Sequence, residues 1–321
     1  MSQYCIGIDL GGTFIKAALV DEEMTLRAQA AAPTPADRGP DGVIETMAAT
    51  AEGLLVEGGI DPRDVLGVGI GSPGPLDLEN GLVIGMPNIP GFDNVPIRDR
   101  LAARLAAPAV LENDANAAAL GEFLAGSGRD VEHMVLLTLG TGLGSGIIIA
   151  GRLLHGAHGL GGELGHLIVQ PGGEPCGCGQ RGCLERYTSA TYLARYARRL
   201  VEQGRGGALA DVFARTGEIT SKDVAEAAGA GDELAGEVWD RAVRHLAIGC
   251  VNVCRILDPD LIVLGGGMAK AGDDLLDPLR EHFRREHWNL AEIRTALALA
   301  SLGNDAGVLG AAGVAWQRFA P

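Results

Sequence analysis

The chain has 321 residues, of which 47% are hydrophobic and 21% are charged. This composition is that of a folded globular protein, and the length suits two domains better than one. Lysine and arginine number 26 against 41 aspartates and glutamates, so the net charge is −15 at pH 7. The sequence offers no basic stripe for a phosphate backbone, which argues against nucleic acid as a partner.

The N-terminal residues lack the basic segment, apolar stretch and small-residue cleavage site of a secretory signal. The most apolar window, residues 134–150, is interrupted by four alternating glycines and is too short to span a bilayer. We therefore expect no membrane segment and a cytoplasmic location, where thiols stay reduced.

Strands and helices alternate along the first part of the chain. It begins with two β-rich runs joined by the glycine turn LGGT. The next stretch has apolar residues at helical spacing and ends in a glycine pair, which predicts a helix with a glycine cap. Such alternation predicts an α/β layer. The expected strands are residues 4–9, 14–20, 65–71 and 109–113, and the expected helices are residues 41–58, 96–107 and 115–125.

An internal repeat links the two halves of the chain. The segment LTLGTGLGSGII at 137–148 follows the pattern of IDLGGTFIKAAL at 8–19, with a strand, a glycine- and threonine-rich turn and a second strand. The repeat predicts duplicated lobes, each with a glycine turn that could hold part of a polyphosphate. Two unrelated hairpins in a chain with 49 glycines are the alternative.

The C-terminal part carries a third glycine turn. Residues 245–257 show helical spacing and precede DPDLIVLGGGMAK, a buried strand followed by three glycines that let a ligand approach the backbone. Residues 305–319 predict a final helix, and the absence of a linker places the hinge near 113–117. We expect a smaller α/β lobe at 1–115, on which a C-terminal helix of about 304–321 packs, and a larger α/β lobe at 116–303 that carries the cysteine loop.

Three of the six cysteines lie together in PCGCGQRGCLE. With the upstream histidine they form the pattern His-x9-Cys-x-Cys-x4-Cys, a donor set typical of closed structural zinc sites. A metal-free redox cluster is the alternative, although no Cys-x-x-Cys is present. The expected zinc ligands are His166, Cys176, Cys178 and Cys183.

Two glutamates flank this cluster. Glu163 lies three residues before His166, and Glu185 lies two residues after Cys183. A bound ion would fix both carboxylates, and a rigid set of acceptors suits a neutral hydrogen-bonding ligand such as a sugar. A solvated glutamate is the alternative for Glu163.

The stretch LENDAN at 111–116 ends a predicted strand and begins a predicted helix. Ligands of open α/β sheets bind at the carboxyl ends of strands. Asp114 is therefore a candidate base as well as a candidate helix cap, and we interpret Asn113 and Asn116 beside it as a sign that the carboxylate faces a ligand.

The first glycine turn, DLGGTFIK at 9–16, is not a Walker A loop, because it lies between two strands. Its amides can still point at a phosphate, and Asp9 is placed to hold Mg²⁺ through water. A bare hairpin turn is the alternative, and the second turn in LGTGLGSG favours the phosphate interpretation.

Together these motifs, with ENDANAAALGE at 112–122, GGELGH at 161–166 and CGCGQRGCLE at 176–185, resemble the ROK family of repressors and sugar kinases. The motifs occur in the family's order from residue 4 to past residue 300. Their sequences are most similar to those of the ATP-dependent glucokinases of the family. The resemblance implies an actin-like, ribonuclease H-like ATPase fold of two α/β lobes with mixed sheets and an interlobe cleft.

The resemblance also implies roles for individual residues. Asp114 would be the catalytic base, and His166 would bind zinc through one ring nitrogen and sugar through the other. The substrate-binding set would be Asn88, Asn113, Asp114, Glu163, His166 and Glu185; the nucleotide-binding set would be Asp9, Gly11, Gly12, Thr13, Lys16, Gly140, Thr141, Gly142, Gly265, Gly266 and Gly267.

The resemblance implies an activity in which a phosphoryl group is transferred from ATP to a hexose with the help of Mg²⁺. The hexose it implies first is glucose, which would place the reaction in glycolysis. It also implies a structural Zn²⁺ ion and a homodimer. Relatives that phosphorylate N-acetylglucosamine, N-acetylmannosamine or fructose share most of the motifs, and polyphosphate is an alternative donor. The repressors of the family carry an N-terminal DNA-binding extension, whereas the phosphate-motif strand here begins at about residue 4. A non-catalytic sugar sensor is disfavoured because Asp114 and both phosphate turns are present.

Overall fold

The computed structural model describes residues 3–86 and 89–320. It divides into two compact units. Unit 1 is Met1–Asp130, Gly146–Gly161 and Ser301–Pro321, and unit 2 is Val131–Ser145 and Gly162–Ala300. The lobe boundary expected at residue 115 stays a prediction.

Unit 1 is built on a mixed five-stranded sheet with the order β3-β2-β1-β4-β8. β1 pairs antiparallel with β2 and parallel with β4, and β4 pairs parallel with β8. The strands are β1 (Tyr4–Leu10), β2 (Phe14–Asp21), β3 (Leu26–Pro33), β4 (Val65–Ser72) and β8 (Ala109–Asn113). The helices are α1 (Gly39–Gly58), α2 (Ile97–Leu105), α3 (Asp114–Ala125) and α10 (Ala306–Phe319). All of these strands and helices were predicted to within three residues at either end, except β3, which was not predicted.

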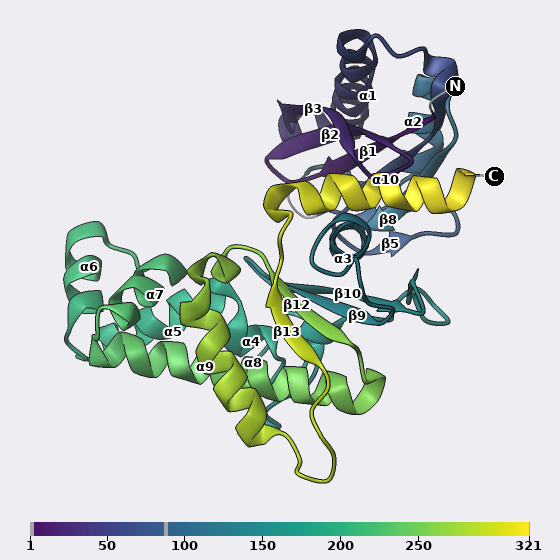
Figure 1. The fold of residues 1–321 in the computed structure, drawn as a ribbon. Coiled ribbons are helices and arrows are strands. Elements are labelled where there is room, and N and C mark those ends of the chain that lie inside the picture. The colour runs from purple at the N-terminus through teal and green to yellow at the C-terminus, as the bar shows by residue number, and fades with distance from the viewer. Residues whose placement is uncertain (1–2, 87–88, 321) are drawn as a thin grey trace. The chain divides into compact units, whose positions relative to one another are not determined.

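The C-terminal helix α10 lies directly against the strands of unit 1, as Figure 1 shows in yellow. Glycines make the close approach possible, since a Cβ on Gly69 of β4 would overlap the carbonyl oxygen of Ala311. The side of the sheet that carries Ile8, Ile70 and their neighbours packs with α1 and α2 in one apolar core. A separate small sheet consists of β5 (Leu76–Asp77), β6 (Leu82–Gly85) and β7 (Asp93–Val95).

Unit 2 contains the parallel strands β9, β12 and β13, with β12 between the other two. The chain leaves unit 2 within β10, which pairs with β11 in unit 1. The strands of this second sheet are β9 (Met134–Leu139), β10 (Leu143–Ile149), β11 (Arg152–Leu153), β12 (Leu261–Gly265) and β13 (Ala296–Leu299). The helices are α4 (Glu185–Thr188), α5 (Ala190–Glu202), α6 (Ala208–Thr216), α7 (Ser221–Gly229), α8 (Glu233–Leu257) and α9 (Asp273–Glu286), with short 3₁₀ turns η3 (Leu164–His166) and η4 (Met268–Ala271).

The second five-stranded sheet has the order β11-β10-β9-β12-β13. In both sheets three consecutive strands of the chain lie side by side, β1 to β3 in one and β9 to β11 in the other. Two later strands then extend each sheet in parallel from the first of the three. The topology therefore repeats, as the duplicated motifs predict. None of the helices within the described residues is both long and apolar enough to span a bilayer.

Candidate functional site

Asp114 is the first residue of α3, at the point where β8 ends. Its Oδ1 accepts a hydrogen bond of 2.8 Å from the N–H of Ala115. The helix cap is the preceding residue, because Asn113 Oδ1 accepts from the N–H groups of Ala115 and Asn116 at 2.9 and 3.2 Å. Asn113 therefore caps the helix and Asn116 binds a neighbouring glutamate, so neither asparagine needs a ligand to account for it. That the Asp114 carboxylate faces a ligand stays a prediction.

That glutamate is Glu112, which sequence reasoning missed. Its Oε1 accepts from the Asn113 N–H and from Asn116 Nδ2, both at 2.9 Å, and its Oε2 lies 2.7 Å from His155 Nε2. Glu112 as a whole residue is 3% exposed. The hydrogen bond to Glu112 raises the pKa of His155 above its usual value, which favours an imidazolium–carboxylate pair. Glu112 thus fixes the turn that carries Asp114; a glutamate in an apolar strand was its only sequence signal.

Asp9 and Asp114 lie close enough to interact electrostatically. Burial and then repulsion from Asp114 raise the pKa of Asp9 to about 6, and Lys16 opposes the shift. Lys16 faces Asp9 in the β1–β2 register, and its Nζ donates to the carbonyl of Asn304 at 3.1 Å. Two carboxylates that repel each other in this way suit a divalent cation between or beside them.

The first glycine turn joins β1 to β2. The N–H of Gly11 donates to the carbonyl of Phe14 at 3.0 Å, so this amide closes the hairpin. Thr34, directly after β3, fixes the turn: its hydroxyl donates to the carbonyl of Gly11 and its N–H donates to the carbonyl of Thr13. Within the described residues the N–H groups of Gly12 and Thr13 make no backbone hydrogen bond, which leaves them for an anion.

Unit 2 carries the other two glycine turns. Gly140 donates to the carbonyl of Gly142 at 3.0 Å, in the turn between β9 and β10 that also carries Thr141. The turn after β12 contains Gly266, whose φ of 83° favours glycine and where a Cβ would press on Leu139. Gly265 ends β12 and Gly267 precedes η4.

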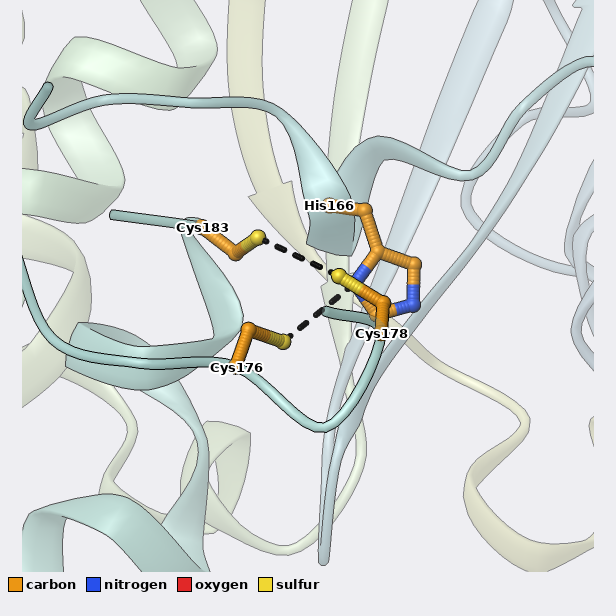
Figure 2. Close-up of side chains that lie close together, drawn as sticks. All are labelled: His166, Cys176, Cys178 and Cys183. Atoms are coloured by element: carbon orange, nitrogen blue, oxygen red, sulfur yellow. Dashed lines mark hydrogen bonds between the residues drawn. The ribbon is translucent and has the colours of Figure 1, made fainter. Parts of the chain in front are cut away.

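The predicted zinc ligands come together in unit 2, as Figure 2 shows. One ligand atom from each residue lies within 4.8 Å of the others. His166 Nδ1 is 3.7 Å from Cys176 Sγ, and the Sγ atoms of Cys178 and Cys183 are 3.6 Å apart. Three soft sulfurs and an imidazole nitrogen at this spacing fit a tetrahedral zinc ion. The nitrogen that faces the sulfurs is Nδ1, so Nε2 is the one that remains for another ligand.

Residues of β10 hold Glu185 directly and hold Glu163 through its chain neighbours. Glu185 Oε2 accepts from the N–H of Leu143 at 3.0 Å, directly after the second glycine turn. Ser145, 8% exposed, accepts from the N–H of Leu164 at 3.1 Å and donates to the carbonyl of Gly162, which brackets Glu163. Sequence reasoning missed Ser145, which lies among the glycines of a motif that we interpreted only as a phosphate turn.

A model of the ROK family matches residues 5–318. The chain belongs to the ROK family. Among curated ROK relatives it is similar to the glucokinase of Thermotoga maritima, 40% identical over 98% of each chain, and to that of Halalkalibacterium halodurans, 38% identical over 96% of this chain and 93% of the relative. It is also 34% identical to the N-acetylmannosamine kinase of Citrobacter koseri, over 96% of this chain and 97% of the relative.

Solved structures of ROK proteins are also similar to this chain. The ROK hexokinase from Thermus thermophilus has a TM-score of 0.84 and 36% identity, and each chain is 99% covered. A ROK glucokinase from Streptomyces griseus, in complex with glucose and AMPPNP, has a TM-score of 0.80 and 36% identity over 98% of this chain and 99% of that chain. The actin-like α/β fold with two lobes of mixed sheets is therefore confirmed, whereas a ligand cleft between the lobes stays a prediction.

The ROK motif residues are divided between the units. Asn88 lies outside the described residues. A hollow of about 1280 Å³ in unit 1 is lined by Glu112 and His155 and does not include Asp9 or Asp114 among its described lining residues. Unit 1 holds Asp9, Gly11, Gly12, Thr13, Lys16, Asn113 and Asp114; unit 2 holds Gly140, Thr141, Gly142, Glu163, His166, Glu185, Gly265, Gly266 and Gly267.

Proposed function

We propose that this protein is an ATP-dependent hexokinase-type sugar kinase whose preferred substrate is glucose, with glucose 6-phosphate as the product. The observation that carries the proposal is the similarity, over nearly the full length of both chains and at 36% identity, to a ROK glucokinase solved in complex with glucose and AMPPNP. Curated glucokinases at 38–40% identity support the same activity. The acidic pair Asp9 and Asp114 supplies groups that suit this chemistry.

Asp114 acts as the base. It accepts the proton of the attacking sugar hydroxyl, which we assign to O6, as the oxygen approaches the γ-phosphorus of ATP. Phosphoryl transfer asks a protein for positioning and charge neutralisation more than for covalent chemistry, so one oriented carboxylate suffices. Glu112 keeps Asp114 in place through the Asn113 backbone and the α3 cap.

The sugar hydroxyls bind to the remaining predicted polar groups. Glu185 uses one carboxylate oxygen for the Leu143 N–H and offers the other to the sugar. His166 offers Nε2, because Nδ1 faces the cysteine sulfurs. Asn113 offers Nδ2, since its Oδ1 caps α3. Glu163 and Asn88 complete the proposed sugar-binding set.

The phosphates of ATP bind to the glycine turns. In the first turn the amides of Gly12 and Thr13 are available, and Thr141 and Gly142 offer amides in the second. Gly265, Gly266 and Gly267 border the adenosine. Mg²⁺, when bound near Asp9, neutralises charge on the β- and γ-phosphates. Lys16 and Gly11 hold the shape of the first turn and of Asp9.

The Cys3His cluster binds a structural zinc ion in this proposal, because the donor set and spacing fit tetrahedral coordination. The ion fixes the loop between Glu163 and Glu185 and supplies no catalytic step. The reduced thiols and the substrate ATP are consistent with the cytoplasm and with a role in glycolysis. From the family resemblance we also propose a homodimer.

The test is a coupled ADP-release assay with ATP and Mg²⁺ against glucose, N-acetylglucosamine, N-acetylmannosamine, mannose and fructose. We expect kcat/KM for glucose to exceed that for each other sugar at least tenfold. Preference for an N-acetyl sugar would keep the mechanism and reject glucose as the substrate. Silence on all five sugars with ATP, followed by activity with polyphosphate, would reject ATP as the donor.

A further inference from the structure

Unit 2 contains a cluster of arginines that the kinase reaction does not use. It surrounds a hollow of about 60 Å³ that is lined by four arginines, two tyrosines and a single carboxylate. In a chain with a net charge of −15, so dense a group of guanidinium ions is out of keeping with the rest of the molecule. The lining residues are Glu174, Arg186, Tyr192, Arg195, Tyr196, Arg199 and Arg241; we call this set the arginine pocket.

The pocket is built from three helices and from Glu174 in the zinc loop, our name for residues 166–183, which carry the proposed zinc ligands. Arg186 comes from the one-turn helix α4, Arg241 from α8, and the two tyrosines with the other two arginines come from α5. On α5 the residues Tyr192, Arg195, Tyr196 and Arg199 are spaced three and four apart, so they share one face of the helix. The pocket thus belongs wholly to unit 2.

The guanidinium groups of the pocket stack on the faces of the two tyrosine rings. The Arg186 guanidinium carbon is 3.2 Å from the centroid of the Tyr192 ring, and that of Arg241 is 4.1 Å from the centroid of Tyr196. Arg195 also lies over Tyr192. A guanidinium donates its hydrogen bonds in its own plane, so stacking on a ring orients the group and leaves its N–H edges for acceptors.

Acceptors for these edges are scarce. Glu174, the single carboxylate among the described lining residues, pairs through Oε1 with Arg199 at 2.8 Å. Within the described part of the chain Arg186, Arg195 and Arg241 form no ion pair. The Nε of Arg186 is buried and has no hydrogen-bond partner among the described residues. A buried donor without an acceptor is costly, which points to an acceptor from outside the chain.

We propose that the arginine pocket binds a dianionic phosphate group, either as inorganic phosphate or as the phosphate of a monoester such as a hexose phosphate. Planar guanidinium groups match the oxygens of phosphate in pairs, and several of them around one anion give the strong charge-assisted bonds that such groups form. The hollow has room for about four water molecules, which suits a single tetrahedral anion and excludes a buried nucleotide.

The test is isothermal titration of inorganic phosphate and of glucose 6-phosphate into the metal-replete full chain without nucleotide. Arg186→Gln and Arg195→Gln remove pocket donors, and the second change is at an exposed side chain on α5, so it tests the proposal even if the first disturbs folding. Arg198→Gln is the matched control, because Arg198 lies on the same helix but pairs with Glu202 and faces Phe213.

We expect each pocket substitution to weaken one phosphate-binding event at least about tenfold, as loss of a charge-assisted hydrogen bond predicts. The control should stay within about twofold of the unmodified chain. Phosphate held by the nucleotide turns would survive all three substitutions, and that result, or an effect equally produced by NaCl at matched ionic strength, would overturn the proposal. In the binding event that Arg195→Gln weakens, tighter binding of glucose 6-phosphate than of phosphate would identify the monoester as the ligand of the pocket; the reverse order would identify the free anion.

The pocket adjoins the proposed sugar site along the chain. Arg186 directly follows Glu185 in α4, and Glu174 donates its N–H to the hydroxyl of Tyr187 at 2.9 Å. Resting on the proposed role of Glu185, we expect pocket occupancy to change the KM for sugar at least twofold with little change in kcat. The change should occur in the unmodified chain and in Arg198→Gln but not in Arg195→Gln. An equal response of all three would overturn this coupling and leave the binding result unaffected.

Discussion

Single side chains at the start of α3 and in β1 carry the proposed chemistry. Asp9 and Asp114 were both singled out from the sequence, because each lies in a polar motif at the end of a strand. Their mutual repulsion was not predictable, since it depends on how β1 and β8 are placed on either side of β4. The same holds for Glu112, whose partner His155 is 43 residues away in the chain.

The raised pKa of Asp9 makes a stability prediction. In the folded chain the carboxyl titrates at about 6 rather than 3.8, so between these values the folded state binds more protons than the unfolded state. Protonation of this group therefore increases the free energy of unfolding as the pH falls through this range. At pH 7.5 the carboxyl is charged, and the charge destabilises the folded state. Asp9→Asn should raise the free energy of unfolding at pH 7.5 by up to about 3 kcal/mol, and should bring no gain below pH 4.

Urea denaturation at the two pH values, without added Mg²⁺, checks this prediction. Asp37→Asn, at an exposed position, serves as the control for a change of net charge. An equal effect of Asp9→Asn at both pH values would show that the carboxyl is not under strain in the folded chain.

At the scale of elements, the β8–α3 junction is locked by one carboxylate. Glu112 is buried, with 3% of the residue exposed, and it accepts three hydrogen bonds. Glu112→Gln replaces one acceptor oxygen by an amide donor and removes the charge that faces His155. We expect the free energy of unfolding to fall by about 1–3 kcal/mol and kcat to fall about tenfold, because Asp114 loses its fixed orientation.

Denaturation and steady-state kinetics measure both effects, with Glu57→Gln at the exposed end of α1 as the control. If Glu112→Gln behaved like this control, the hydrogen-bonded junction would have no part in placing Asp114.

The zinc loop is the element that was best predicted from sequence. The cysteine and histidine spacing predicted that four donor residues would come together, because they lie within one short segment whose glycines allow it to fold back on itself. Which ring nitrogen of His166 faces the sulfurs, and the anchoring of Glu163 by Ser145, depended on the fold and could not be predicted.

Cys183→Ser should abolish stoichiometric metal binding, since Cys183 is fully buried within the cluster. Without the ion we expect faster hydrogen exchange across residues 163–185 and sugar binding weakened about tenfold or more. Metal analysis, hydrogen exchange and calorimetry with glucose measure these effects, and Cys250→Ala in α8 is the control that should keep the metal. Unchanged sugar affinity in the metal-free chain would reduce the cluster to a structural link remote from the sugar.

At the scale of the whole molecule, the repeated sheet order agrees with the internal repeat of the sequence. The sequence predicted the hairpins because each is local, with two strands and a short glycine turn. It did not predict that residues 146–161 would group with the N-terminal unit, because this grouping depends on long-range packing such as the approach of Gly146 to Ala119.

The net charge of −15 gives a prediction for the molecule as a whole. MgATP is anionic, so the acidic protein repels it over distances that salt screens. We expect kcat/KM for MgATP to rise about twofold between roughly 20 and 150 mM KCl, with a smaller change for uncharged glucose at saturating ATP. A fall in kcat/KM for MgATP would mean that local positive groups dominate its approach.

The central claim is that Asp114 is the base for phosphoryl transfer to a sugar. Its most direct test is Asp114→Ala, assayed for ADP release with saturating glucose and, in the same preparation, for equilibrium binding of glucose. We predict that kcat falls by a factor of about 10³ or more while the dissociation constant for glucose changes by less than about threefold. A kcat within tenfold of the unmodified enzyme, with sugar binding intact, would contradict the claim and place the base elsewhere.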